Sequence, residues 1–281
     1  MIGKDASSSV NRPVVLVTGA SSGIGKRCSE YLSRQGCRVY GGSRNPSFAV
    51  EGPALCFEPL QMDVTSDDAV QNACKHVLDR EGRLDVVVNN AGMGIAAAVE
   101  DTSVREAMEQ FDVNFLGVLR VCRTVLPIMR KQGAGYIINI GSIGGLIAIP
   151  YQGLYSASKF ALEGLTEALR LEVRGLGIRV VLIEPGDHRT SFTHNRRLTA
   201  ASAENPAYRG PLERAIRRMA ADEQAGPEPD KIARLVHRLI YTRSPRLRYT
   251  VGPMSQRAAV WLKRVAPYSV IEKALKLYYT G

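Results

Sequence analysis

Apolar residues recur along the first two thirds of the chain in two alternating patterns. Short runs of consecutive apolar residues predict strands at Val14–Thr18, Arg38–Ser43, Val86–Asn89, Tyr136–Ile140 and Arg179–Glu184. Between them, apolar residues at helical spacing predict helices at Ile24–Gln35, Ser66–Asp79, Ser103–Arg130 and Tyr151–Arg174. A further short strand is expected to end at Asp63. Uninterrupted apolar strands are typical of a parallel sheet that is covered on both faces.

This alternation predicts an α/β fold with right-handed crossovers and one doubly wound parallel sheet. In such a sheet the ligand crevice lies beyond the carboxyl ends of the strands. After a polar, basic segment at about 186–226, which reads as a mobile substrate loop or small helical lid, a helix at Pro229–Ile240 and a strand near Leu247–Val251 resume the pattern. We therefore expect a flexible arm over 1–12, a catalytic domain over 13–255 and a C-terminal extension over 256–281.

The net charge of +10 lies entirely in the last third of the chain. Residues 1–195 hold 20 basic and 20 acidic side chains, whereas residues 196–281 hold 17 and 7. The extension mixes aromatic and aliphatic residues with Lys and Arg, which predicts a basic amphipathic helix pair that breaks at Pro267. It could contact a membrane surface, cover a substrate cleft, form a dimer contact, bind an acidic partner, or present a solvated basic face.

Other classes of protein are disfavoured by the same sequence. Five scattered cysteines without CxxC spacing indicate reduced thiols, and the four histidines form no metal-binding pattern, so no metal site is expected. The N-terminus lacks the apolar core of a secretory signal, and glycines and polar residues interrupt the uncharged stretch between Lys131 and Lys159. No nucleic-acid-binding module is recognisable in the basic tail. We expect a cytoplasmic protein, with peripheral membrane association as the alternative.

The first chemical signal is a glycine-rich loop at Thr18–Gly25, with the sequence TGASSGIG. It directly follows the first strand and opens the first helix. Glycines there let the backbone turn tightly and approach a pyrophosphate, whose charge the helix N-terminus attracts. The spacing Gly-x3-Gly-x-Gly differs from the general dinucleotide fingerprint GxGxxG.

The end of the second strand carries a signal for the coenzyme. A site selective for NAD offers an acidic side chain to the ribose 2′-hydroxyl at this point. Here Ser43 takes that position and Arg44 follows, which suits a 2′-phosphate. We therefore expect NADP(H) to be preferred over NAD(H).

The second chemical signal combines Ser142, after a predicted strand, with Tyr155 and Lys159. A pair four residues apart shares one helix face, so the ammonium can lie near the phenol. A nearby positive charge is expected to lower the pKa of the Tyr155 phenol from its usual value and make it an acid–base group. Ser142 can then hold a carbonyl oxygen.

Taken together, these motifs resemble the short-chain dehydrogenase/reductase family over about Pro13–Thr190, and more weakly to about Val251. The matching positions are TGASSGIG, Asp63-Val64, Asn89-Asn90-Ala91-Gly92, Asn114, Ser142, Tyr155-x3-Lys159 and Pro185-Gly186 with Thr190. The resemblance implies a Rossmann-type fold and a catalytic set of Asn114, Ser142, Tyr155 and Lys159.

The resemblance also implies coenzyme contacts. The residues expected to make them are Gly19, Ser21, Ser22, Gly23, Ile24, Gly25, Arg44, Asp63, Val64, Asn89, Ala91, Gly92, Tyr155, Lys159, Pro185, Gly186 and Thr190. Asp63 would contact the adenine, and Lys159 the ribose of the nicotinamide. The chain departs from the pattern of the family at two places. Asp187-His188-Arg189 replaces a stretch where the family usually has at least one aliphatic residue. Ser22 lacks the basic side chain that many NADP-using members have at this position.

The sequence thus predicts an NADP(H)-dependent oxidoreductase that interconverts an alcohol and a ketone or aldehyde, on a lipophilic substrate resembling a steroid, retinoid or fatty compound. The alternatives are a reductase of 3-oxoacyl groups on an acidic carrier protein and a non-catalytic NADP(H)-binding sensor. A homodimer or homotetramer is expected, through the helices that contain Phe111–Leu126 and Lys159–Leu171.

Overall fold

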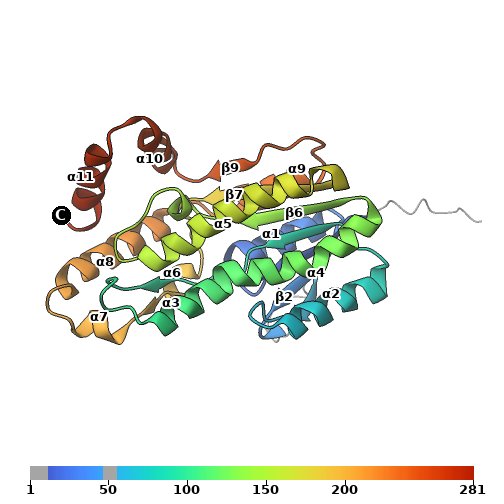
Figure 1. The fold of residues 1–281 in the computed structure, drawn as a ribbon, viewed down its shortest axis with the longest axis horizontal. Helices are drawn as coiled ribbons and strands as arrows, with labels where there is room; N and C mark the ends of the chain where they lie inside the picture. The colour runs from blue at the N-terminus through green and yellow to red at the C-terminus, as the bar shows by residue number, and fades with distance from the viewer. Residues whose placement is uncertain (1–11, 47–55) are drawn as a thin grey trace, which may run out of the picture.

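The computed structural model describes residues 12–46 and 56–281. Within them, seven parallel strands form one sheet in the order β3-β2-β1-β4-β6-β7-β9 (Figure 1). Their bounds are β1 Val14–Thr18, β2 Arg38–Ser43, β3 Glu58–Gln61, β4 Val86–Asn89, β6 Gly135–Ile140, β7 Ile178–Pro185 and β9 Arg248–Val251. A two-stranded parallel sheet pairs β5 (Ile95–Ala96) with β8 (Arg197–Leu198). This is the doubly wound α/β fold that the alternating pattern predicts.

Helices cover both faces of the large sheet, and alternate residues of each strand point to opposite faces. One face carries α2 (Asp67–Glu81), α4 (Gly117–Gln132) and α5 (Gly153–Glu172), and its core includes Leu16, Ile137 and Leu162. The other carries α1 (Gly23–Arg34) and α9 (Asp230–Ile240), and its core includes Val17 and Val236. Burial on both sides explains why the strands read as continuous apolar runs.

The order of the strands fixes where a ligand can bind. The chain builds outward from β1 to β3 on one side, then returns to place β4 on the other side of β1. After β1 the chain enters α1 on one face of the sheet, and after β4 it goes on to α4 on the other face. In a sheet of this order a ligand is expected to bind at the carboxyl ends of these strands. The glycine-rich loop and the residues after Asn89 meet there.

Two predicted elements need correction. The strand expected to end at Asp63 ends at Gln61. The single helix expected over Ser103–Arg130 is α3 (Val104–Phe111), a π-helical turn at Asp112–Leu116, and α4. Apolar spacing alone does not distinguish a π turn from α-helix, because the extra residue shifts the face only locally. The arm expected over 1–12 lies, apart from Arg12, outside the described residues.

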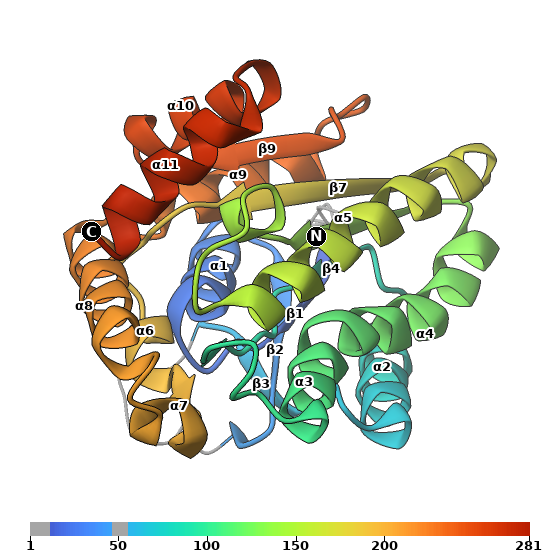
Figure 2. The ribbon, with the colours of Figure 1, turned by 60° about the vertical axis from the view of Figure 1, so that its left-hand side comes forward.

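The segment after β7 carries three helices, α6 (Phe192–Asn195), α7 (Ala200–Glu204) and α8 (Arg209–Ala225). The C-terminal extension is a helix pair, α10 (Met254–Val265) and α11 (Tyr268–Tyr279), with Pro267 at the break. Figure 2 shows α11 returning to lie beside α8. Arg218 on α8 donates to the Tyr278 hydroxyl at 2.7 Å, so the pair is fastened to the segment that follows β7.

None of the helices in the described ranges is both long and apolar enough to cross a membrane.

Candidate active site

The loop between β1 and α1 is shaped by close backbone contacts. Gly19 has a φ of +67°, in the left-handed region that favours glycine. A Cβ at Gly25 would lie 2.3 Å from the Gly19 carbonyl oxygen, so the loop folds onto the first turn of α1 without room for a side chain. In the described part of the chain, the N-cap Ser22 makes no side-chain hydrogen bond to α1, unlike Ser66 on α2 and Ser103 on α3. The first N–H groups of α1 are thus available to an anion such as a pyrophosphate.

The loop after β4 holds the glycine-rich loop in place. The side-chain amide of Asn90 donates to the carbonyl oxygens of Thr18 at 3.0 Å and Gly19 at 3.1 Å. The Thr18 hydroxyl accepts from the backbone N–H groups of Asn90 and Ala91, each at 3.0 Å. Asn90 stands in the NNAG motif, but its role as the tie between two loops depends on a contact across 71 or more residues, which the sequence did not reveal.

The residues after β7 close a third side of the crevice. The Gly186 N–H donates to the Val251 carbonyl at 2.7 Å, and a Cβ at Gly23 would lie 3.4 Å from the Thr190 Cβ. Thr190 therefore lies against the glycine-rich loop. Pro185 is the buried last residue of β7.

Ser142 and Tyr155 meet at the carboxyl end of β6. The Ser142 hydroxyl accepts from the Gly144 N–H at 2.9 Å and lies close enough to the Tyr155 phenol to lower its pKa. A Cβ at Gly144 would lie 3.1 Å from the Tyr155 ring, so glycine is needed for the turn to pass between them. The structure brings the predicted serine and tyrosine into contact.

The electrostatics of Tyr155 differ from the expectation that Lys159 lowers its pKa. Burial raises the pKa of the Tyr155 phenol to about 12, and the hydrogen bond from Ser142 opposes this only in part. Burial also lowers the pKa of Lys159 to about 8. The ammonium lies 5.9 Å from the Tyr155 ring centroid and donates to the Ile140 carbonyl at 2.9 Å. Desolvation therefore dominates over the helical pairing, and Tyr155 is protonated at neutral pH.

Asn114 lies at the π-helical turn, fully buried. Its amide exchanges two hydrogen bonds with the backbone of Met93, at 2.8 and 3.0 Å. It also donates to the Ser158 hydroxyl at 3.1 Å, which in turn donates to the Tyr155 carbonyl at 2.7 Å. Asn114 thus links the loop after β4 to the helix that carries Tyr155. π turns of this kind are frequent at functional sites.

Comparison with known proteins agrees with this geometry. The model of the short chain dehydrogenase family matches residues 13–201. The chain belongs to this family.

Similar proteins extend over nearly the whole chain. The 3-ketodihydrosphingosine reductase of Bacteroides thetaiotaomicron is 41% identical over 95% of this chain and 97% of its own. A short chain dehydrogenase/reductase of Burkholderia phymatum in complex with NAD is 26% identical, with a TM-score of 0.78 over 90% of this chain and 93% of that one. An alcohol dehydrogenase of Thermococcus sibiricus complexed with 5-hydroxy-NADP is also 26% identical, with a TM-score of 0.67 over 86% and 96%. This short-chain dehydrogenase is thus an oxidoreductase of CH–OH groups.

Some predicted coenzyme residues of this dehydrogenase have side chains engaged within the protein. Asn89 is buried and donates to Asn139 at 2.8 Å, so its side chain is engaged within the protein. One carboxylate oxygen of Asp63 accepts hydrogen bonds from the N–H and the hydroxyl of Thr65. The other carboxylate oxygen takes no part in these two bonds. The Val64 side chain packs where a Cβ on Gly117 would lie, 2.9 Å away.

The remaining predicted coenzyme residues keep solvent-facing surface at the mouth of the crevice. These are Ser21, Ile24, Arg44 and Gly92, of which Ile24 also packs partly against the core.

The segment after β7 adds residues that sequence reasoning missed. The Phe192 ring lies 5.6 Å from the Tyr155 ring, centroid to centroid, and covers the phenol. Behind it, the buried Arg196 guanidinium pairs with Glu223 on α8. Asp187 is clamped by Gln256 of α10, whose amide oxygen accepts from the Asp187 N–H at 2.9 Å and whose amide nitrogen donates to its carboxylate. The unusual Asp187 position therefore joins the site to the C-terminal extension.

Proposed function

We propose that this short-chain dehydrogenase uses NADP(H) to reduce the ketone of a lipophilic substrate to a secondary alcohol. The proposal rests on the proximity of Ser142 and Tyr155, with the Lys159 ammonium 5.9 Å from the Tyr155 ring. The bound nicotinamide would supply the hydride. The chain would supply orientation, a hydrogen-bond donor for the carbonyl oxygen, and the proton.

Each catalytic role follows from the environment of the side chain. The Ser142 hydroxyl would hold the carbonyl oxygen next to the Tyr155 phenol, and the phenol would donate the proton as charge develops on that oxygen. A phenol whose pKa is raised to about 12 stays protonated at neutral pH, so the proton that reduction requires is present on Tyr155. Lys159, whose pKa of about 8 keeps part of its charge, would stabilise the phenolate left behind and contact the ribose. Asn114 would hold Tyr155 in register through Ser158.

The coenzyme would lie between three loops. Its pyrophosphate would meet the N–H groups at Gly23 to Gly25, with Thr190 closing over them. Asp63, Val64, Asn89, Ala91 and Gly92 would surround the adenosine, through backbone atoms at Asn89. Pro185 and Gly186 would border the nicotinamide.

The preference for NADP(H) rests on the carboxyl end of β2. Ser43 is buried and donates to the Asn45 carbonyl at 2.8 Å, while Arg44 is exposed. Within Gly42–Pro46 no carboxylate is present to accept the ribose 2′-hydroxyl or repel a phosphate. The two solved relatives hold NAD and an NADP derivative, so this choice depends on the residues of the individual chain.

Replacing Arg44 with Ala should weaken NADPH binding by at least about tenfold, since a hydrogen bond to a charged group contributes about 1.5–3 kcal/mol. NADH binding should stay unchanged. Fluorescence titration of both coenzymes at fixed salt measures this, with Arg34→Ala, on an arginine in the last turn of α1, as the matched control. Equal losses for both coenzymes, or tighter binding of NADH by the wild type, would contradict the proposal.

The substrate class is supported by the covering Phe192 ring and by the reductase of Bacteroides thetaiotaomicron, named for 3-ketodihydrosphingosine. That compound is a long-chain ketone with an amino group beside the carbonyl. Asp187 lies close enough to Tyr155 to raise its pKa, and among residues 12–46 and 56–281 it forms no ion pair with Lys or Arg. We therefore propose that the Asp187 carboxylate pairs with an ammonium next to the reacting ketone.

Replacing Asp187 with Asn should raise KM for a long-chain amino ketone by about tenfold, because one charge-assisted hydrogen bond is lost. KM for an amine-free ketone of equal chain length should not change, because Asn keeps the shape and can still pair with Gln256. Steady-state NADPH oxidation with both ketones measures the effect. A parallel rise for both substrates would indicate a structural role for Asp187 instead.

Two other functions give different results in the same assays. A reductase of 3-oxoacyl groups on an acidic carrier would act on the carrier-bound ketone and not on free lipids. A coenzyme-binding sensor would bind NADPH without turning over any ketone. We also propose a homodimer or homotetramer through α4 and α5, where Phe160 and Leu171 are exposed, and light scattering measures the mass.

A further inference from the structure

The edge strand β9 and helix α10 border a groove on the far side of the extension from α8. Its volume is about 360 Å³, and its walls include Arg246, Tyr249, Arg257, Trp261 and Arg264. Val260 of α10 is buried against the fold, whereas Arg257, Trp261 and Arg264 are exposed beside it. The groove is therefore open, cationic and flanked by an aromatic ring.

Most of this positive charge is not neutralised by the protein. Arg248, at the base of the groove, is paired with Glu163, Glu167 and Glu184. Among the residues the structure describes, Arg246, Arg257 and Arg264 form no ion pair. Residues 241–281 hold eight basic side chains and one acidic. The groove thus presents three guanidinium groups to whatever anion approaches it.

Large apolar side chains are exposed along the same helix pair. The exposed fractions are 63% for Trp261, 60% for Val265, 68% for Tyr268 and 78% for Leu277. Such side chains interleaved with Arg and Lys are typical of helices that lie in a bilayer interface, where rings and aliphatic groups enter the headgroup region and cations stay at the phosphates.

We propose that α10 and α11 dock this enzyme on an anionic bilayer, with lipid phosphate groups in the groove between β9 and α10 and Trp261 inserted among the headgroups. A second copy of the chain fits this face less well, because a two-fold contact would bring this basic face against an identical basic face. A bilayer rich in anionic lipid supplies the opposite charge over the whole surface.

The proposed docking surface, formed by α10 and α11, is connected to the active site. The link between docking and substrate entry rests on the proposed function. Gln256 of α10 clamps Asp187, and Lys263 of α10 donates to the Leu146 carbonyl in the turn after Ser142. Tyr278 of α11 donates to Asp222 of α8 at 2.8 Å. The helices that would touch the bilayer therefore also contact segments beside the active site. This arrangement would let a lipophilic ketone enter the site from the membrane.

The chain contains a single tryptophan, so Trp261 itself reports docking. The experiment adds vesicles of phosphatidylcholine, with or without about one third phosphatidylglycerol, to the full-length protein and records tryptophan emission and vesicle co-sedimentation. We expect a blue shift, protection from acrylamide quenching and co-sedimentation with anionic vesicles only, all reduced by added salt.

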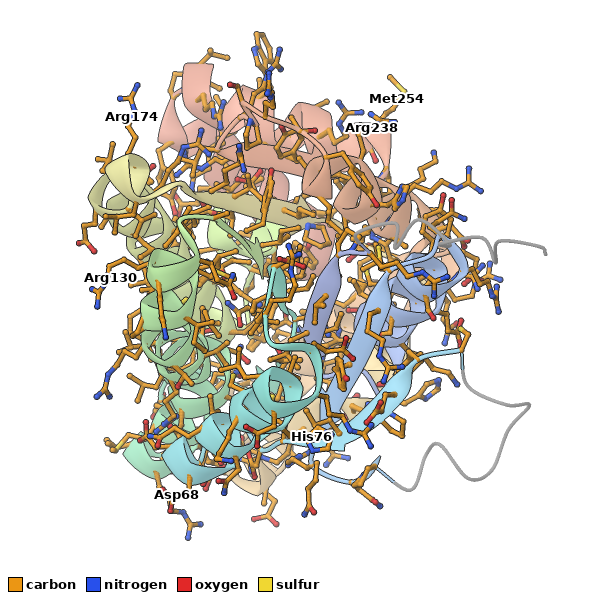
Figure 3. All side chains as sticks on the ribbon, turned by 90° about the vertical axis from the view of Figure 1, so that its right-hand side faces the viewer. Asp68, His76, Arg130, Arg174, Arg238 and Met254 are labelled. Atoms are coloured by element: carbon orange, nitrogen blue, oxygen red, sulfur yellow. The ribbon has the colours of Figure 1, made fainter. Side chains whose placement is uncertain are left out.

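The variant R257Q/R264Q should bind anionic vesicles about thirtyfold more weakly, about fivefold for each arginine removed. The control R130Q/R174Q removes the same charge from exposed positions at the ends of α4 and α5. Figure 3 shows Arg130 and Arg174 on the left of the view and Met254, the first residue of α10, at the upper right. The control should bind like the wild type.

Three results would overturn the proposal: no emission shift with anionic vesicles, equal loss in both double variants, or a shift that follows protein concentration without lipid, which would indicate contact between copies. Reduction of a small water-soluble ketone without vesicles is measured in parallel. Failure of docking with that activity intact overturns the docking alone, whereas loss of the activity in the wild type overturns the proposed function.

Discussion

Replacing Tyr155 with Phe is expected to lower kcat by about a hundredfold to ten-thousandfold, because proton transfer by a positioned side chain contributes about 10²–10⁴ in rate and Phe has no hydroxyl to donate. The Phe ring keeps the contact with Phe192 and the shape of the buried pocket. Binding of NADPH should therefore be nearly unchanged. Stopped-flow or steady-state oxidation of NADPH with a ketone, together with a coenzyme titration, measures both quantities.

The matching variant Ser142→Ala separates the two hydroxyls of the site. It removes one hydrogen bond to the carbonyl oxygen and the one that lowers the pKa of Tyr155, but it leaves the proton donor. Its kcat should fall by about a hundredfold. Retained activity in Tyr155→Phe would show that another group donates the proton, and would remove the basis for the proposed reaction.

Replacing Gly25 with Ala is expected to weaken the binding of NADPH strongly. The added Cβ would lie 2.3 Å from the Gly19 carbonyl oxygen and 2.4 Å from the Asn90 side-chain nitrogen. The loop must then move away from the start of α1 or break its tie to Asn90. Overpacking of this kind lowers the free energy of unfolding by about 1–3 kcal/mol, and we expect NADPH affinity to fall by about a hundredfold.

Gly175→Ala is the control for this substitution. A Cβ at Gly175 would meet nothing within 4 Å, and its φ does not lie in the left-handed region. Ala there should raise the free energy of unfolding by about 0.4–1 kcal/mol, because it restricts the unfolded chain. Denaturant titration and NADPH titration of both variants give the comparison. Wild-type affinity in Gly25→Ala would mean that the loop tolerates a side chain and that close packing does not shape the coenzyme site.

The two substitutions probe different layers of the same site. Tyr155 acts through its chemistry, in a position set by α5, whereas Gly25 acts through the absence of a side chain where two loops cross. The first change should leave the fold and coenzyme binding intact, and the second should damage both. Observing that contrast would distinguish the side chain that reacts, Tyr155, from the loop packing at Gly25 that shapes the coenzyme site.

The sequence determined the elements whose signals are local. Alternating apolar runs and helical spacing placed β1, β2 and β4 at their observed bounds, because strands buried on both faces must be apolar at consecutive positions. At the start of α3, Ser103 and Glu106 form a capping box, a motif specified by two residues three positions apart. The break of the C-terminal helices at Pro267 has a local cause, since proline cannot continue a helix.

Only the tertiary structure decided what depends on contacts between distant residues. The tie from Asn90 to the glycine-rich loop joins residues 71 or more positions apart, and the clamp of Gln256 on Asp187 joins residues 69 apart. The pKa of Tyr155 rises because the surrounding fold removes water, whereas its spacing from Lys159 alone suggested a fall. Local patterns fix which residues form an element, but burial and long-range pairing fix the protonation state and the partners of each side chain.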